Sequence, residues 1–212
     1  MINQDALFEV EVRCHFNDSD QAYQTLPFLS SCLQHEASWV TTFYGLKLFQ
    51  SGQLLRAGNA VIDKDTRHFL GWKGPDTGKF ANIRQELDEE ITSEPTNSPI
   101  LKLLGGNANI SGNNKVIQEL GRLGYHKFMS FEGFDITGYY EPYGISVKLM
   151  NCQMIKWPLL LEIEKTANTE KEAVRCEEAL RELCGQFQLQ SRLVREEPPS
   201  LLYNTLFIPN SR

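Results

Sequence analysis

The stretch Phe8-Glu9-Val10-Glu11-Val12-Arg13 decides how this chain folds. It alternates apolar and charged residues, which is the pattern of a β-strand with one face against a core. Successive strand side chains point to opposite faces, so Glu9, Glu11 and Arg13 share one face at a spacing of about 6 to 7 Å. A similar stretch, Leu160-Leu161-Glu162-Ile163-Glu164-Lys165, occurs near the C-terminus. Two such strands together predict one acidic site.

Three more segments in the first half of the chain carry charges on probable strands. Leu54-Leu55-Arg56 and Gly71-Trp72-Lys73 each end in a base, and Arg84-Gln85-Glu86 holds a base and an acid on one face. A single strand of this kind is ordinary in an open antiparallel sheet with one solvated face. If all these charges line the inside of a closed barrel, however, the carboxylates can bind a metal ion and the bases can bind phosphates.

Length and composition limit the class of protein. A chain of 212 residues is expected to form one domain or at most two small ones. A formal charge of -6 argues against general nucleic-acid binding. The longest apolar run, residues 155–163, is too short and too interrupted to cross a bilayer, and the N-terminus lacks the apolar run of a signal peptide. We therefore expect neither a nucleic acid nor a membrane as partner.

The cysteines and histidines predict no metal or disulfide framework. The five cysteines are an odd number without C-x-x-C spacing, and the four histidines are scattered. These features favour a reducing, cytoplasmic setting.

The order of elements predicts two strand-rich halves in a single domain. The first half spans about 6–92, residues 93–99 form a linker, the second half spans about 100–187, and 188–212 form a tail. Pro27 is expected to split or kink a helix over residues 20–33. The run Asp88-Glu89-Glu90 is interpreted as a solvated charge run. The tail is apolar enough to pack against the body or to bind a partner. We expect these further elements: strands at 6–16, 38–45, 52–63, 67–73, 80–87, 125–140, 143–152 and 159–166, and helices at 99–104, 114–123 and 169–187.

Taken in order, these motifs resemble the CYTH domains, also called triphosphate tunnel metalloenzymes. That family includes class IV adenylate cyclases, thiamine triphosphatases and inorganic triphosphatases. The resemblance covers about residues 7–185, and it depends on the order and spacing of short motifs. The matching segments are Glu9-Val10-Glu11-Val12-Arg13, Thr42-Phe43-Tyr44, Gly52-Gln53-Leu54-Leu55-Arg56, Leu70-Gly71-Trp72-Lys73-Gly74, Arg84-Gln85-Glu86 and Leu161-Glu162-Ile163-Glu164.

The resemblance implies an α+β fold, in which eight antiparallel strands form a closed or nearly closed barrel with helices packed outside. In such a tunnel, bases bind a triphosphate while carboxylates bind Mg²⁺ or Mn²⁺. The residues that this implies are Glu9, Glu11, Glu162 and Glu164 for the metal, Arg56, Lys73, Arg84 and Glu86 for catalysis, and Arg13, Arg56, Lys73 and Arg84 for binding the substrate.

The chain departs from the family pattern at several bases. Gly58 stands where the family commonly has a second base after Arg56, and the segment at 129–134 has no K-x-R pair. That segment offers Phe131 and Phe134 instead, and we expect these rings to bind an apolar part of the substrate. Ordinary barrel packing is the alternative role for each ring. The substrate expected from this contrast has a short phosphate group and an organic body.

Three functional hypotheses stay open on the sequence alone. The first is a metal-dependent phosphohydrolase that acts on a phosphorylated small molecule. The second is a cyclase, lyase or isomerase that uses the tunnel for an apolar substrate. The third is a binding module without catalysis. Metal-dependence and triphosphatase assays separate the first from the others, and the oligomeric state is left open.

Overall fold

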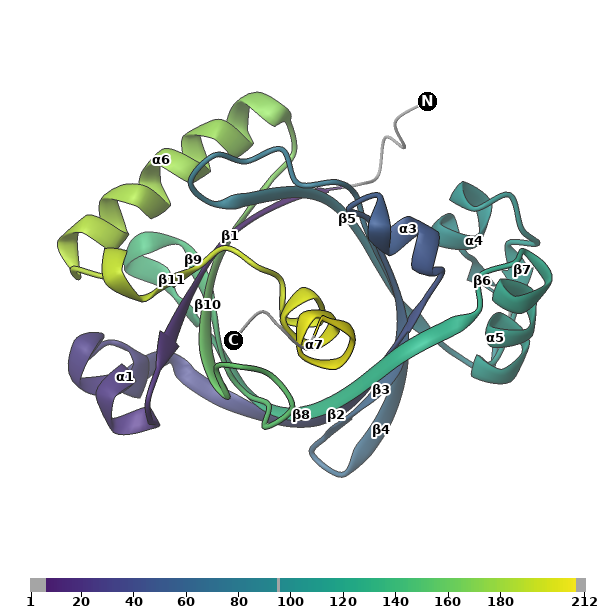
Figure 1. Ribbon diagram of the computed structural model, residues 1–212, viewed down its shortest axis with the longest axis horizontal. Coiled ribbons are helices and arrows are strands. Elements are labelled where there is room, and N and C mark those ends of the chain that lie inside the picture. The colour runs from purple at the N-terminus through teal and green to yellow at the C-terminus, as the bar shows by residue number, and fades with distance from the viewer. Residues whose placement is uncertain (1–6, 95, 209–212) are drawn as a thin grey trace.

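The computed structural model describes residues 7–94 and 96–208, and its centre is a closed barrel of eight antiparallel strands (Figure 1). Neighbouring strands follow the order β10-β9-β8-β2-β3-β4-β5-β1, and pairing of β1 with β10 closes the ring. The predicted fold class is therefore confirmed. The barrel strands are β1 (Leu7–Phe16), β2 (Leu33–Tyr44), β3 (Leu54–Ile62), β4 (Asp65–Lys73), β5 (Asn82–Ile91), β8 (Lys127–Tyr140), β9 (Ile145–Asn151) and β10 (Leu159–Ala167).

The helices lie outside the wall, with one exception (Figure 1). As predicted, Pro27 lies between two short helices, α1 (Ser19–Thr25) and α2 (Leu29–Cys32). A short β6–β7 ladder lies between the two halves, where a linker was expected. The remaining elements are α3 (Leu46–Gln50), β6 (Thr96–Asn97), α4 (Pro99–Leu103), β7 (Asn109–Ile110), α5 (Asn113–Arg122), the 3-10 turns at Glu141–Tyr143 and Gln190–Arg192, α6 (Glu170–Gln186), β11 (Leu193–Val194) and α7 (Pro198–Phe207).

Most of the hydrophobic core lies between the outside of the barrel and its covering helices. Val10, Val12 and Ile163 point outward from β1 and β10 and pack with Leu180 and Leu183 of α6. On the opposite side, residues of β3 and β4 pack against α4 and α5. Because strand side chains alternate, this arrangement leaves the inner face to the charged residues of β1 and β10.

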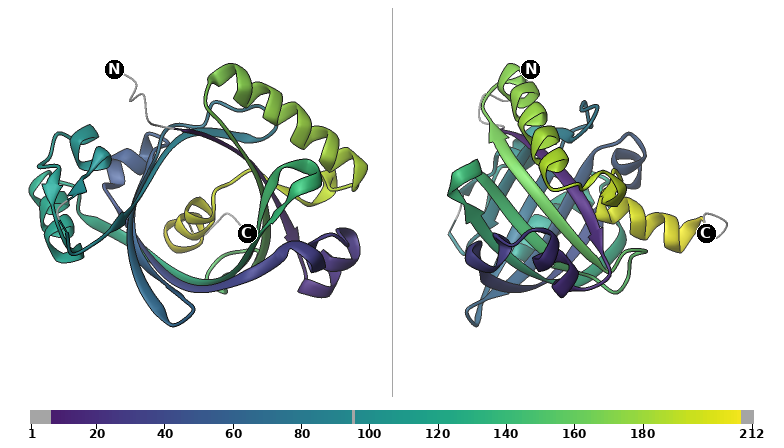
Figure 2. Two further views of the ribbon diagram at one scale, coloured as in Figure 1. Left: turned by 180° about the vertical axis from the view of Figure 1, so that it is seen from behind. Right: turned by 90° about the vertical axis from the view of Figure 1, so that its left-hand side faces the viewer.

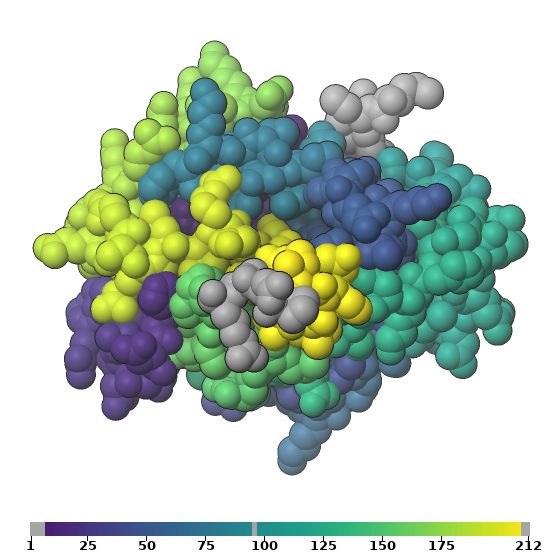
Figure 3. All heavy atoms as spheres, in the orientation of Figure 1, coloured from purple at the N-terminus to yellow at the C-terminus, as the bar shows by residue number. Residues whose placement is uncertain are grey.

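Helix α7 is the exception, because it lies at one mouth of the barrel (Figures 1 and 2). Its Leu201 and Leu202 pack on Phe43, Met129 and Phe131, which point inward from β2 and β8. Figure 3 shows α7 covering the barrel mouth that faces the viewer. The tail as far as residue 208 thus packs against the body, which was one of the two possibilities left open by its composition.

Several predicted boundaries need adjustment. β2 begins at Leu33, five residues earlier than expected, and β5 continues to Ile91. The acidic run at 88–90 is therefore part of a barrel strand, in which Asp88 and Glu90 are exposed to solvent as predicted for a charge run. Ala6, the expected start of the first strand, lies outside the described residues. No helix in 7–94 and 96–208 is long and apolar enough to cross a membrane.

Candidate active site in the tunnel

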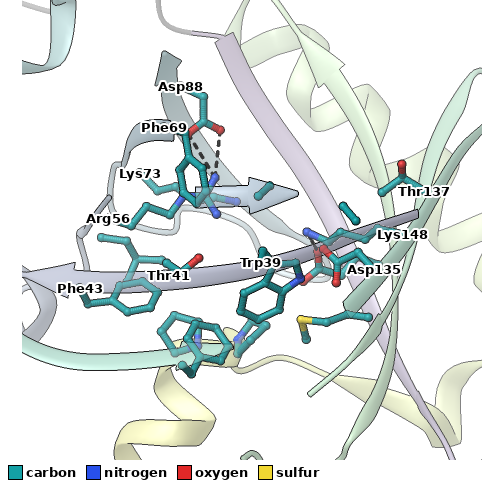
Figure 4. Close-up of a pocket in the computed structure, with 18 of the residues that line it drawn as sticks. Trp39, Thr41, Phe43, Arg56, Phe69, Lys73, Asp88, Asp135, Thr137 and Lys148 are labelled. Atoms are coloured by element: carbon teal, nitrogen blue, oxygen red, sulfur yellow. Dashed lines mark hydrogen bonds and ion pairs between the residues drawn. The ribbon is translucent and has the colours of Figure 1, made fainter. Parts of the chain in front are cut away.

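A cavity of about 500 Å³ occupies the inside of the barrel. Its walls come from both halves of the chain, with Arg56 and Lys73 on one side and Asp135 and Lys148 on the other (Figure 4). Glycines on the inner face keep room for these side chains. A Cβ added at Gly71 would lie 2.3 Å from Asp88 Oδ1 and 2.6 Å from Arg56 Nε, so a larger residue there would displace this ion pair.

Arg13 is the most deeply buried charge in the tunnel, with 1% of its surface exposed. Its guanidinium donates to Glu162 at 2.9 Å, to Glu197 at 2.8 Å and to Glu11. Burial opposes its charge, but Glu197 and Glu162 outweigh that effect and raise the pKa of Arg13. Buried charges are tolerable only when they are paired in this way. The guanidinium thus joins β1, β10 and the start of α7.

Lys73 and Arg56 form a second ion-pair network on β4 and β3. The Lys73 ammonium donates to both Glu9 carboxylate oxygens, at 2.6 and 2.7 Å, and lies 3.5 Å from Glu86. Arg56 donates to Glu86 at 3.0 Å and to Asp88 at 2.9 Å. The acidic run at 88–90, interpreted as solvated, thus contributes Asp88 to the tunnel.

Arg84 connects the barrel to the C-terminal segment. Its Nη1 donates to the carbonyl oxygens of Gly52 and Gly74, and its Nε lies 3.0 Å from Glu197 Oε1. Glu197 precedes α7 directly and is 5% exposed. The same carboxylate therefore contacts two of the bases that the sequence assigned to a substrate phosphate.

The second half of the barrel holds carboxylates that the bases compensate only in part. Glu162 pairs with Lys148 and Arg13, which outweigh burial and hold its pKa below the usual range. Glu164 has no ion-pair partner among the residues that the structure describes, and burial together with Glu9 raises its pKa to about 7. Burial likewise raises the pKa of Asp135 to about 6, although Lys148 opposes the shift. Proton binding is therefore favoured at Glu164 and Asp135, but not at Glu162.

An aromatic wall adjoins these carboxylates. The rings of Trp39 and Phe131 meet edge to face at 4.9 Å, and Phe43 lies 5.6 Å from Phe131. Gly133 lies opposite Trp39 in the strand register, and a Cβ there would come within 2.5 Å of the indole. Phe131 lines the cavity as expected, but Phe134 lies on the outer face and is 39% exposed. Its predicted contact with a substrate in the tunnel is therefore wrong.

The other predicted site residues lie on the inner face of the barrel, as strand alternation and their contacts with one another indicate. Their chemical roles stay predictions. These residues are Glu9, Glu11, Arg13, Arg56, Lys73, Arg84, Glu86, Phe131, Glu162 and Glu164. Sequence reasoning missed Lys148, Asp135 and Glu197. The alternation Ser146, Lys148, Met150 would have pointed to Lys148, whereas no local pattern marks Glu197.

The predicted metal ligands have suitable chemistry but are occupied by bases in this arrangement. Carboxylate oxygens suit Mg²⁺ or Mn²⁺, and Glu11 lies opposite Glu164 in the strand register. Glu9, however, contacts Lys73, and Glu162 contacts Arg13. Within residues 7–94 and 96–208, no group of three or more acidic, histidine or cysteine side chains is arranged to hold an ion. Metal binding would require these carboxylates to exchange a base for the ion.

No protein-family model and no curated protein sequence matches this chain. Its structure is similar to that of a protein from Pyrococcus horikoshii OT3, with a TM-score of 0.72 and 17% identity over 93% of this chain and 99% of that one. An adenylate cyclase candidate from Vibrio parahaemolyticus has a TM-score of 0.64 and 16% identity, over 92% of this chain and 97% of that one. An adenylyl cyclase candidate from Hippeastrum has a TM-score of 0.57 and 16% identity, over 94% of this chain and 96% of that one. That protein is described as having a dominant triphosphatase activity. These likenesses confirm the fold expected from the sequence.

Proposed function

We propose, from its triphosphate tunnel (CYTH) fold, that this protein is a metal-dependent enzyme acting on a phosphorylated small molecule, most simply as a phosphohydrolase. The observation that supports this most is the convergence of Arg13, Arg56, Lys73 and Arg84 on one tunnel. Guanidinium and ammonium groups suit phosphate oxygens, and a low-dielectric tunnel strengthens their effect on charge that develops during phosphoryl transfer. The adenylyl cyclase candidate of the same fold, with its triphosphatase activity, supports the same class of substrate.

In the proposed mechanism, Arg56 and Lys73 have a different role from Arg84. Arg56 and Lys73 contact Glu86 from neighbouring strands, so Glu86 is placed to orient both and to exchange them with an incoming phosphate. Two backbone carbonyls accept hydrogen bonds from Nη1 of Arg84, and these bonds fix the direction in which its Nη2 group points. Such pre-positioning lowers the reorganisation needed in the transition state.

We also propose that Glu9, Glu11, Glu162 and Glu164 bind Mg²⁺ or Mn²⁺. When bound, the ion would polarise a phosphoryl oxygen and help to activate water. A cation near Glu164 would also relieve the repulsion from Glu9 that contributes to its raised pKa. The bases that now pair with Glu9 and Glu162 would then be free for phosphate.

A specific observation favours a second candidate, a cyclase, lyase or isomerase that acts on an apolar substrate. Trp39, Phe43 and Phe131 form an aromatic wall in the same tunnel.

A phosphorylated substrate with an organic body would contact both the aromatic wall and the bases. Under the leading proposal we therefore expect inorganic triphosphate to be turned over less well than an organic phosphate. A higher kcat/KM for inorganic triphosphate than for every organic substrate would contradict this.

Steady-state kinetics test the proposal directly. Inorganic triphosphate, thiamine triphosphate, nucleotides and prenyl diphosphates would be screened with Mg²⁺ or Mn²⁺. Arg56→Gln and Lys73→Gln are each expected to lower kcat/KM by about 100-fold or more. Each substitution removes a positive charge that would stabilise the negative charge developing on the phosphate. Lys102→Gln, at an exposed position of α4, is the matched control. Phosphate release that is unchanged in both tunnel variants, or absent with all substrates, would refute the phosphohydrolase.

A further inference from the structure

Carboxylates outnumber bases on the inner face of the described barrel. The inner bases are largely neutralised already, since Lys73 contacts Glu9, Arg56 contacts Asp88, and Lys148 contacts Glu162. A purely anionic ligand would have to compete with every one of these pairs. The acids that face the tunnel are Glu9, Glu11, Glu86, Asp88, Asp135, Glu162, Glu164 and Glu197, and the bases that pair with them are Arg13, Arg56, Lys73, Arg84 and Lys148.

Asp135 is the surplus acid with the most specific surroundings. Its Oδ1 and Nε1 of Trp39 on the neighbouring strand are both buried, and the indole acts on the carboxylate as a side-chain hydrogen-bond donor that lowers its pKa. Both residues line the cavity, and Figure 4 shows their side chains close together. One indole N–H satisfies at most one of the acceptor positions of a carboxylate, so the unused acceptors of Asp135 at a cavity suggest a ligand that supplies the missing interactions.

The groups around Asp135 leave its charge partly unbalanced. Lys148 on β9 is the base with the largest effect on Asp135, but Lys148 pairs with Glu162 on β10. Arg56 on β3 also acts on Asp135, but it pairs with Glu86 and Asp88. The Trp39 ring on β2 supplies the apolar side of the site. A carboxylate beside aromatic rings is the combination that proteins use for cationic nitrogen groups.

Building on the proposed function, we propose that the substrate's organic body carries a cationic nitrogen, quaternary or protonated, which binds against Asp135, Trp39 and Phe131. The phosphate end would then lie toward Arg56 and Lys73, on the opposite wall of the cavity (Figure 4). A ligand with both charges suits the tunnel better than a polyanion, because it meets the surplus acid as well as the bases. The substrate class is therefore a phosphorylated amine or quaternary ammonium compound.

Four small ligands test the contributions of the phosphate charge and of the positive charge on the organic body separately. Phosphocholine and 3,3-dimethylbutyl phosphate have the same shape, but only the first carries a positive charge on its body. Choline and 3,3-dimethylbutanol are the corresponding pair without phosphate. Their dissociation constants would be measured by calorimetry without divalent metal, so that turnover does not interfere. We expect phosphocholine to bind at least about tenfold more tightly than 3,3-dimethylbutyl phosphate, whose organic body is uncharged.

Asp135→Asn keeps the shape of the side chain but removes its charge, so it is expected to reduce this preference to below about threefold. Glu132→Gln makes the same charge change at an exposed position of β8 and should keep the full preference. Trp39→Leu, which removes the ring but leaves the carboxylate, should lose part of it. Equal binding of the two phosphates to the wild type would overturn the inference, as would an unchanged preference in Asp135→Asn.

The same four ligands distinguish this inference from the proposed function. If both phosphates bind more tightly than their alcohols but the body charge has no effect, phosphate binding stands and the cation subsite is wrong. If phosphate adds nothing while choline still binds more tightly than 3,3-dimethylbutanol, the cation subsite stands and the phosphohydrolase is wrong. Thermal unfolding of each variant would verify that it is folded.

Discussion

The Glu197 carboxylate accepts a 2.8 Å hydrogen bond from the Arg13 guanidinium, although 184 positions separate the two residues in the chain. The same carboxylate lies 3.0 Å from Arg84 Nε. Glu197 is held there by α7, whose Leu201 and Leu202 pack inside the barrel mouth. The C-terminal segment therefore supplies an anion to two bases that a substrate phosphate would also contact.

The first prediction is that Glu197→Gln raises the affinity of the tunnel for phosphate. The amide keeps the shape but no longer neutralises Arg13 and Arg84, and charge-assisted hydrogen bonds contribute about 1.5 to 3 kcal/mol each. We expect 3,3-dimethylbutyl phosphate to bind about tenfold more tightly in a calorimetric titration. Glu196→Gln, at an exposed neighbouring position, is the control. Equal affinity in Glu197→Gln and wild type would show that Glu197 does not compete with phosphate.

Arg13 is predicted to be the tunnel residue on which stability depends most. Replacing it with Met leaves Glu11, Glu162 and Glu197 buried without their shared partner. Breaking a buried ion pair in this way typically costs about 3 to 5 kcal/mol. Urea unfolding should report a loss of that size for Arg13→Met, whereas Lys102→Met on the surface of α4 should change the free energy of unfolding by less than about 0.5 kcal/mol. A small loss at Arg13 would mean that the carboxylates find other partners.

Stability is predicted to fall with rising pH because of Asp135. Its pKa is about 6 in the folded protein, against 3.8 for an unperturbed aspartate, so the folded state binds more protons than the unfolded state between these values. Stability should therefore decline as pH rises from about 4 to about 6, by about 1 to 3 kcal/mol from this group. Asp135→Asn should remove that part of the decline, whereas Glu132→Gln should keep it. The free energy of unfolding would be measured with urea across this pH range. If it declines equally in wild type and Asp135→Asn, the assignment to Asp135 is wrong.

Metal binding can be tested without activity. If Glu11 and Glu164 hold Mn²⁺, the ion should raise the melting temperature of the wild type in a concentration-dependent way, because it binds only the folded state. Glu11→Gln and Glu164→Gln should each weaken or abolish that rise. Glu170→Gln, at the exposed start of α6, should respond like the wild type. An equal response in all of these proteins would place the ion elsewhere.

Much of the barrel was predictable because the side-chain period of a strand is two. Alternation in residues 8–13 and 160–165 assigned Glu9, Glu11 and Arg13 to one face, and Glu162 and Glu164 to another, before any pairing was known. The same rule could have corrected the error at Phe134. Phe131 and Phe134 are separated by an odd number of positions, so they point to opposite faces of the regular strand β8.

The sequence by itself thus determined the eight barrel strands, the helices interrupted at Pro27, and which side chains of β1 and β10 share a face, because these depend on local geometry. Only the tertiary structure decided which faces meet. Closure of β1 onto β10 places Arg13 beside Glu162 and Glu11 beside Glu164. The path of the tail depends on the packing of α7 against inner residues of β2 and β8. Glu197 therefore enters the tunnel through contacts between distant segments, and such contacts leave no periodic signal in the sequence.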